Sequence, residues 1–457
     1  MTARVWFAVF LCCAPWAVAA ETLPVTLEEA CSLAYQTHPQ LKAARLQVEA
    51  LDEEYNKALS GFRPTIKVYG DKGYVDETVD KRFGDNDKGD QVDARDPYTV
   101  GVMHEQPLYR GGKTMAEMDL AVAQIAVGRE TLRHQTQQVL LDTLKAYVGV
   151  VTAQEILTFH RAYQQILEDN VIITEARFQA GDVTMTDVSL SKSRVARART
   201  DVNHAQRTLA AKRADFMAMV GVLPGSLRDM PKSPKTPETL AAATDRALAK
   251  NPLLQAAYRT IEAKDADVDR ISSGYRPELS VESKIYRQED PSFDDQRREG
   301  AETKVVLKIP LYDGGMVSAW TRQAKKERQR ASHQKDSVYR DVVRDVTLAW
   351  RDLETATLDL DSTQAEVTSA LKASDGMKEE LDMGFRSTLD FLDAEQDLLG
   401  AQRRFSTTKG QKLVAEYTLL AAMGELDIRK LSKKTKPYNP KDHFEKIKGL
   451  SYGWWQE

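Results

Sequence analysis

The stretch Pro107-Leu108-Tyr109-Arg110-Gly111-Gly112 returns 203 residues later as Pro310-Leu311-Tyr312-Asp313-Gly314-Gly315. Each copy follows a segment in which apolar and polar residues alternate, and each precedes a long run without proline. Because the same motifs recur in the same order, the sequence predicts an internal two-fold repeat, and the repeated unit determines the fold.

Earlier motifs of the repeat have a different offset. Arg63-Pro64 matches Arg276-Pro277, and Thr26-Leu27 matches Thr239-Leu240, both at a distance of 213 residues. The ten-residue difference therefore lies between the Arg-Pro and Pro-Leu-Tyr motifs of the unit. An insertion of this kind is tolerated best at an exposed loop tip.

Each segment between these motifs predicts a pair of strands, at about 64–108 and about 277–311. In the first copy a polar loop from Asp76 to Asp96 separates the strands, and its residues Asp85–Asp90 are a poor match to a calcium loop. A strand with one apolar and one polar face suits a membrane barrel between lipid and a wet lumen. Two hairpins on a soluble domain fit the alternation equally well.

The two runs without proline predict very long helices, Lys113 to Gln179 and Gly315 to Met383. At about 1.5 Å per residue, each would be roughly 100 Å long. A glycine ends each helix, and a shorter helix then returns to a second glycine. These glycines are Gly181 and Gly221 in the first copy, and Gly384 and Gly424 in the second. The sequence thus predicts two helical hairpins, about 113–221 and about 315–424.

The remaining segments complete the predicted domain map. Residues 1–20 have the pattern of a secretory signal peptide with a cut after Ala20, which leaves Cys31 as a single thiol without a disulfide partner. Repeat 1 is expected at 21–221, a linker at 222–238, repeat 2 at 239–424, and a C-terminal periplasmic tail at 425–457. A net charge of −4 with 29% charged residues argues against a nucleic-acid partner.

Four strands cannot close a barrel, and an open sheet in lipid would leave unpaired backbone groups at its edges. Neighbouring copies would have to supply the missing strands. Three protomers would give twelve strands, an even number within the range of outer-membrane barrels. The residues predict closure by oligomerisation, but they do not fix the number of copies.

The doubled motifs together resemble the TolC family of outer-membrane factors, from about Thr26 to about Leu426. The resemblance implies a mainly α fold with a β-barrel portion: a homotrimer with a 12-stranded outer-membrane β-barrel, four strands per protomer, that continues into a periplasmic α-helical coiled-coil barrel. Such a duct is no enzyme and uses no cofactor or metal. Its partners would be a periplasmic adaptor (membrane fusion protein) and an inner-membrane ABC or proton-driven transporter of a Gram-negative bacterium.

The resemblance also assigns roles to residues at the hairpin tips. Asp390 and Asp393 match the pore constriction, and Thr186, Asp187 and Arg386 match links that hold the closed gate. Leu381 stands where the family usually has a tyrosine in that link. The positions that match adaptor contacts are Gly181, Asp182, Val183, Thr184, Gly384, Phe385, Arg386 and Ser387.

The residue pattern alone gives the two aspartates a chemical role. Asp390 and Asp393 lie three apart and share one helix face, so a three-fold axis would arrange six carboxylates around one aperture. Such a ring attracts cations, and repulsion within it should raise some of the pKa values. An ordinary solvated helix face is the alternative interpretation of the same spacing.

Two kinds of export duct and one other class of protein remain open at this point. The stretch Thr184-Met185-Thr186-Asp187-Val188 is similar to type I protein secretion members, which favours that role over the outer-membrane part of a multidrug or metal efflux pump. A periplasmic coiled-coil adaptor or scaffold without a barrel is the alternative of another class. We find no constellation of catalytic or zinc-binding residues in the sequence.

Overall fold

The computed structural model describes residues 26–79, 91–225, 227, 230–292, 295–432 and 435–451. The expected signal peptide and the loop residues Asp85–Asp90 lie outside these ranges. The chain divides into two units. The hairpin unit comprises Met1–Ala34, Thr143–Lys232 and Ala365–Gly410, and the sheet unit comprises Tyr35–Asp142, Ser233–Gln364 and Gln411–Glu457.

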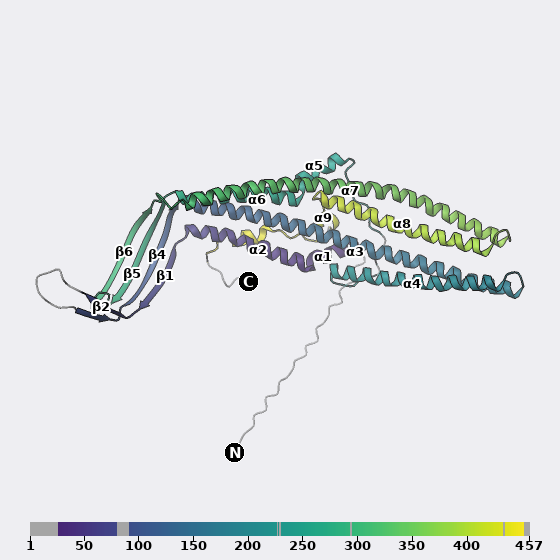
Figure 1. Ribbon diagram of the computed structural model, residues 1–457, viewed down its shortest axis with the longest axis horizontal. Coiled ribbons are helices and arrows are strands. Elements are labelled where there is room, and N and C mark those ends of the chain that lie inside the picture. The colour runs from purple at the N-terminus through teal and green to yellow at the C-terminus, as the bar shows by residue number, and fades with distance from the viewer. Residues whose placement is uncertain are drawn as a thin grey trace, which may run out of the picture. The chain divides into compact units, whose positions relative to one another are not determined.

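The sheet unit contains an antiparallel four-stranded sheet in the order β1-β4-β5-β6 (Figure 1). Its strands are β1 Thr65–Lys72, β4 Tyr98–Arg110, β5 Glu278–Glu289 and β6 Arg297–Lys308. The first repeat supplies β1 and β4, the second supplies β5 and β6, and β4 pairs directly with β5. The four strands predicted from the sequence are confirmed, and the two repeats share one sheet.

The two faces of this sheet differ in chemistry. On one face Val68, Val102 and Ile285 lie side by side on neighbouring strands, and all three are exposed. The opposite face carries cross-strand ion pairs, including Lys284–Glu302 at 2.8 Å. The alternation of side chains along each strand produces this separation, because successive residues point to opposite faces.

The expected polar loop between β1 and β4 contains additional structure. Its two ends pair as an antiparallel ribbon, β2 Val75–Val79 with β3 Gln91–Arg95. An ion pair of 3.2 Å between Arg95 and Glu77 crosses the ribbon. The acidic residues of this stretch obscure the alternation that would predict β2, so the sequence indicates only a loop there.

Each repeat contains one helical hairpin. The first consists of α3 Lys113–Gln179 and α4 Met185–Val220, and the second of α7 Met316–Asp382 and α8 Thr388–Ala422. The long helix has 67 residues in both repeats. None of the helices within the described ranges is both long and apolar enough to cross a membrane.

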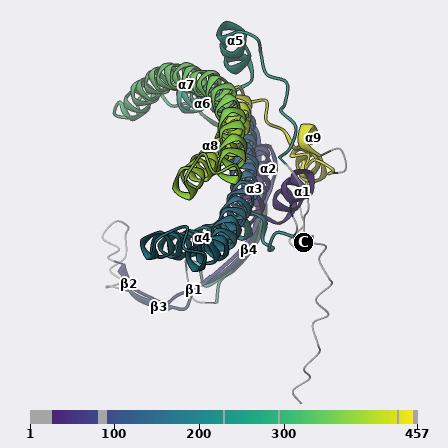
Figure 2. The same ribbon diagram turned by 90° about the vertical axis from the view of Figure 1, so that its right-hand side faces the viewer.

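In the sheet unit, one shorter helix of each repeat lies along the long helix that follows it. Figures 1 and 2 show α2 beside α3 and α6 beside α7. Ion pairs join each couple: Arg129 of α3 to Asp52 of α2 at 3.3 Å, and Arg328 of α7 to Asp265 of α6. The shorter elements are α1 Leu27–Thr37, α2 Pro39–Leu59, α5 Leu240–Lys250, α6 Pro252–Ser272, α9 Ile428–Leu431, α10 Lys441–Ile447 and the 3₁₀ turns Ser60–Phe62 and Ser273–Tyr275.

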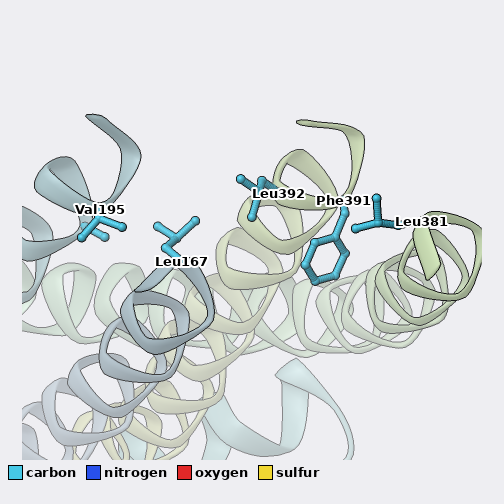
Figure 3. Close-up of a cluster of buried hydrophobic side chains, with 6 residues drawn as sticks. Leu167, Val195, Leu381, Phe391 and Leu392 are labelled. Carbon is cyan, nitrogen blue, oxygen red and sulfur yellow. The ribbon is translucent and has the colours of Figure 1, made fainter. Parts of the chain in front are cut away.

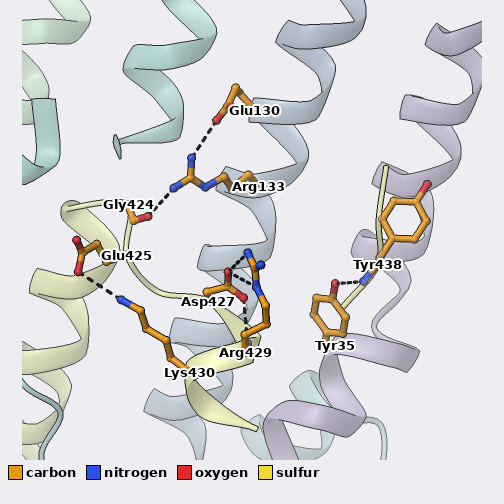
Figure 4. A network of polar contacts seen from close by, with 9 residues as sticks. All are labelled: Tyr35, Glu130, Arg133, Gly424, Glu425, Asp427, Arg429, Lys430 and Tyr438. Atoms are coloured by element: carbon orange, nitrogen blue, oxygen red, sulfur yellow. Dashed lines mark hydrogen bonds and ion pairs between the residues drawn. The ribbon is translucent and has the colours of Figure 1, made fainter. Parts of the chain in front are cut away.

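A network of polar contacts fixes the turn after α8 in the sheet unit (Figure 4). Arg133 of α3 donates a hydrogen bond of 2.8 Å to the carbonyl oxygen of Gly424 and pairs with Glu130. Lys430 pairs with Glu425 in the residues that follow. Gly424 itself is left-handed, with φ of 72°, so it ends the helix as a glycine commonly does.

We expect Gly424→Ala to destabilise the protein more than Gly384→Ala, although both glycines have positive φ. A Cβ at Gly384 would meet nothing within 4 Å, so its cost is about 1 kcal/mol of backbone strain. A Cβ at Gly424 would clash with the carbonyl oxygen of Lys250, which should bring the cost to about 2 kcal/mol. Thermal unfolding of the two variants checks this, and equal melting temperatures would contradict it.

Candidate functional site at the hairpin tips

Both helical hairpins turn at a left-handed glycine. Gly181 has φ of 84° and Gly384 has φ of 81°. The residue after each glycine donates a backbone hydrogen bond across the helix end, from Asp182 to Arg177 at 2.9 Å and from Phe385 to Glu380 at 2.8 Å. Nothing lies near either glycine to exclude a side chain, so the left-handed backbone is what favours glycine there.

The returning helices begin with the same device in both repeats, a reciprocal capping box. The backbone N–H and the hydroxyl of Thr184 both donate to the carboxylate of Asp187 at 2.8 Å. The N–H and hydroxyl of Ser387 donate to Asp390 in the same way, at 3.1 and 2.8 Å. These bonds satisfy backbone groups that a helix start otherwise leaves free, and they hold each tip in a defined conformation.

Asp187 and Asp390 are therefore structural equivalents in the two repeats, although the family resemblance gives them different roles. Hydrogen bonds from Thr184 lower the pKa of Asp187, and hydrogen bonds from Ser387 lower that of Asp390. Within one protomer this effect opposes the raised pKa expected for a ring of carboxylates. Both side chains are thus held in the ionised form at neutral pH.

The other predicted constriction residue, Asp393, has a partner in the first repeat. Arg194 of α4 forms an ion pair of 2.8 Å with Asp393 of α8. Arg386 pairs with Glu380 at 2.8 Å in its own hairpin, whereas the exposed Thr186 lies beside the capping box. The gate link between Arg386 and Asp187 would join neighbouring protomers, and it stays a prediction.

A small apolar core lies behind the tips and joins all four helices of the hairpin unit (Figure 3). Leu381, which stands in place of the usual tyrosine, is only 8% exposed and packs in this core with Phe391 and Leu392. Its role in this protomer is packing. The buried members are Leu167, Val195, Ala198, Leu381, Phe391 and Leu392.

The turns themselves present apolar side chains to solvent. Phe385 is 77% exposed at the second tip, and Met383 and Met185 are also exposed. Large apolar groups held on a rigid turn are typical of surfaces that bind another protein. Among the described residues, no group of histidine, cysteine or carboxylate side chains is placed to hold a metal ion.

Each repeat consists of a strand pair and a long helical hairpin, and the two strand pairs share one sheet. This architecture is that of an outer-membrane channel protomer. The sequence profile described as "Outer membrane efflux protein" matches residues 30–222 and 243–425, one match in each repeat. The chain belongs to this family, the TolC family of outer-membrane channels. It is a non-enzymatic exit duct of the Gram-negative outer membrane that extends into the periplasm.

Curated relatives align over most of the chain. The outer membrane efflux protein BepC of Brucella suis is 27% identical over 94% of this chain and 92% of its own. The alkaline protease secretion protein AprF of Pseudomonas aeruginosa is 24% identical over 86% of this chain and 83% of its own. Outer membrane protein TolC of Escherichia coli is 23% identical over 86% of this chain and 80% of its own.

Solved structures confirm the fold. The Campylobacter jejuni CmeC outer membrane channel superposes with a TM-score of 0.75 at 16% identity, over 92% of this chain and 89% of its own. The CusC structure gives a TM-score of 0.73 at 16% identity, over 87% of this chain and 92% of its own. These similarities concern the fold as a whole.

Proposed function

We propose that three copies of this chain form the outer-membrane exit duct of a tripartite system for type I protein secretion. The tips would dock with a periplasmic adaptor, and an inner-membrane ABC transporter would drive the cargo. The observation that carries this proposal is the pair of capped turns with exposed apolar side chains, above all Phe385. They form a preorganised surface for another protein, which lowers the entropy cost of binding.

The sheet supports the trimer. Among the described strands, β1 and β6 each lack a partner on one side. In lipid these edges would be costly, and pairing β1 of one protomer with β6 of the next removes them. The exposed apolar face would then contact lipid and the charged face would line a wet lumen, as in a twelve-stranded barrel. Proteins of this family form trimers.

The cargo is the finer part of the proposal. Two relatives are named for protease secretion. AprF of Pseudomonas aeruginosa is 24% identical to this chain, and PrtF of Dickeya chrysanthemi is 23% identical. Together with the Thr184–Val188 stretch of the first tip, this favours protein secretion. Efflux of small molecules is the second candidate because BepC, at 27% identity, is named an efflux protein. The alternative of another class, a periplasmic coiled-coil adaptor or scaffold without a barrel, is disfavoured by the family match in both repeats.

A deletion strain complemented with tip variants tests the docking surface and the cargo together. We expect Phe385→Ser to lower export at least tenfold, because it removes an apolar anchor from the proposed contact. Leu46→Ser, which changes an exposed leucine on α2, is the matched control and should retain export. Trimers of both variants should form normally in the outer membrane.

The readouts are the proteins secreted into the medium and the sensitivity of the cells to dyes and antibiotics. Loss of a secreted protein without a change in drug sensitivity supports type I secretion. Loss of drug resistance with a normal set of secreted proteins would assign the duct to an efflux pump. Full export by Phe385→Ser would show that the adaptor does not use this tip.

A further inference from the structure

The two carboxylates of the predicted constriction have different partners. Asp390 is bonded inside its own turn, to the N–H and hydroxyl of Ser387. Asp393 is bonded across the repeats, to Arg194 at 2.8 Å, and these two residues are 199 positions apart in the sequence. The partner of Asp390 therefore moves with its own helix, whereas the partner of Asp393 belongs to the other hairpin.

Arg194 is fixed more firmly than the carboxylate that it meets. Its side chain is 20% exposed, whereas that of Asp393 is 59% exposed. Its sequence neighbour Val195 and the neighbour of Asp393, Leu392, both belong to the apolar core behind the tips. Within the described residues, the second terminal nitrogen of Arg194, Nη1, is buried without a hydrogen-bond partner. The guanidinium thus has little freedom to follow Asp393 when the hairpins separate.

We propose that Arg194 masks Asp393 in the resting protomer, so that the acidic constriction is completed only when the two hairpins move apart. This inference rests on the duct function proposed above. In the closed state Asp390 alone would contribute free negative charge, and Arg194–Asp393 would hold α4 against α8. Separation of the hairpins breaks the pair and exposes a second carboxylate from each protomer. Opening of the gate therefore also increases its preference for cations.

Ion currents through trimers in planar bilayers test the proposal, because two variants break the same pair and leave opposite charges. We expect both Arg194→Gln and Asp393→Asn to raise the open probability about fivefold, as suits the loss of a partly exposed ion pair. Selectivity should diverge. In the resting state, Arg194→Gln leaves Asp393 unmasked and should increase cation selectivity, whereas Asp393→Asn leaves the charge of Arg194 unpaired and should decrease it.

Arg199→Gln is the matched control, since Arg199 also lies on α4 but pairs with Glu168 inside the first hairpin at 2.9 Å. It should behave as wild type. The exchanged pair Arg194→Asp/Asp393→Arg should restore the wild-type open probability, which a merely unfolded tip would not do.

The proposal is overturned if Arg194→Gln behaves as Arg199→Gln, or if both single variants shift selectivity in the same direction. It is also overturned if the exchanged pair stays as open as the single variants. A wild-type trimer that forms no conducting pore would refute the duct itself, and the proposed masking would fall with it. These results distinguish a failure of the link from a failure of the proposed function.

Discussion

Asp390→Asn/Asp393→Asn is expected to abolish the cation selectivity of the channel while it leaves the trimer assembled. A threefold arrangement of Asp390 and Asp393 places up to six carboxylates at the tips, and acidic rings select cations because their field repels anions. Asparagine has nearly the same shape and removes only the charge. The reversal potential of the double variant in a salt gradient should approach zero, whereas wild type should follow the cation gradient.

The pH dependence of selectivity separates two opposite effects on the pKa of Asp390: the hydrogen bonds of its capping box and the repulsion between carboxylates in the ring. Hydrogen bonds from Ser387 lower the pKa of Asp390, so its charge is present at neutral pH and is lost only as the pH falls through the lowered value. We expect selectivity to stay constant from about pH 7 to pH 5 and to decline below about pH 4. A decline already near about pH 6 would show that repulsion between neighbouring protomers outweighs the caps. Selectivity that ignores the double substitution would place the constriction elsewhere.

Periodic and repeated features of the fold could be predicted from the sequence. The long helices follow from runs without proline, and the hairpin turns follow from Gly181 and Gly384 in matching positions. The capping boxes also have a local signature, because Thr184 and Ser387 each precede an aspartate by three residues. Asp187 and Asp390 are also related by the 203-residue offset of the repeat, so their equivalence could be predicted from the sequence.

Contacts between distant parts of the chain could not be predicted in this way. No periodicity relates Arg194 to Asp393, because their meeting depends on how two hairpins pack. Leu381 shows the same limit. The family resemblance presents it as a lost hydrogen bond, whereas the structure places it in an apolar core. The apolar packing of Leu381 depends on how the four helices meet, so it could not be predicted from the residue type alone.

The C-terminal tail has a fixed place in the sheet unit, although its composition does not predict one. α10 packs against α2, where Phe444 meets the ring of Tyr55 edge to face with centroids 5.4 Å apart. Asp52 of α2 is 0% exposed. One of its oxygens is 3.1 Å from Nδ1 of His443, and the other is 3.3 Å from Arg129. A buried carboxylate thus ties the tail to α2 and α3.

We expect Asp52→Asn to destabilise the protein by about 3 kcal/mol, because charged hydrogen bonds are lost and Arg129 keeps its charge in a partly buried place. Thermal unfolding measures the cost, and limited proteolysis should cleave the tail of the variant faster than that of wild type.

Asp265→Asn is the matched control, since Asp265 pairs with Arg328 in the same unit but both side chains are half exposed. Its effect should stay within about 0.5 kcal/mol. Asp52→Asn could have the same melting temperature as the control while proteolysis cleaves its tail faster. In that case Asp52 contributes only to docking of the tail. If the variant also keeps the tail protected, the aromatic contacts of α10 hold the tail without the buried charge.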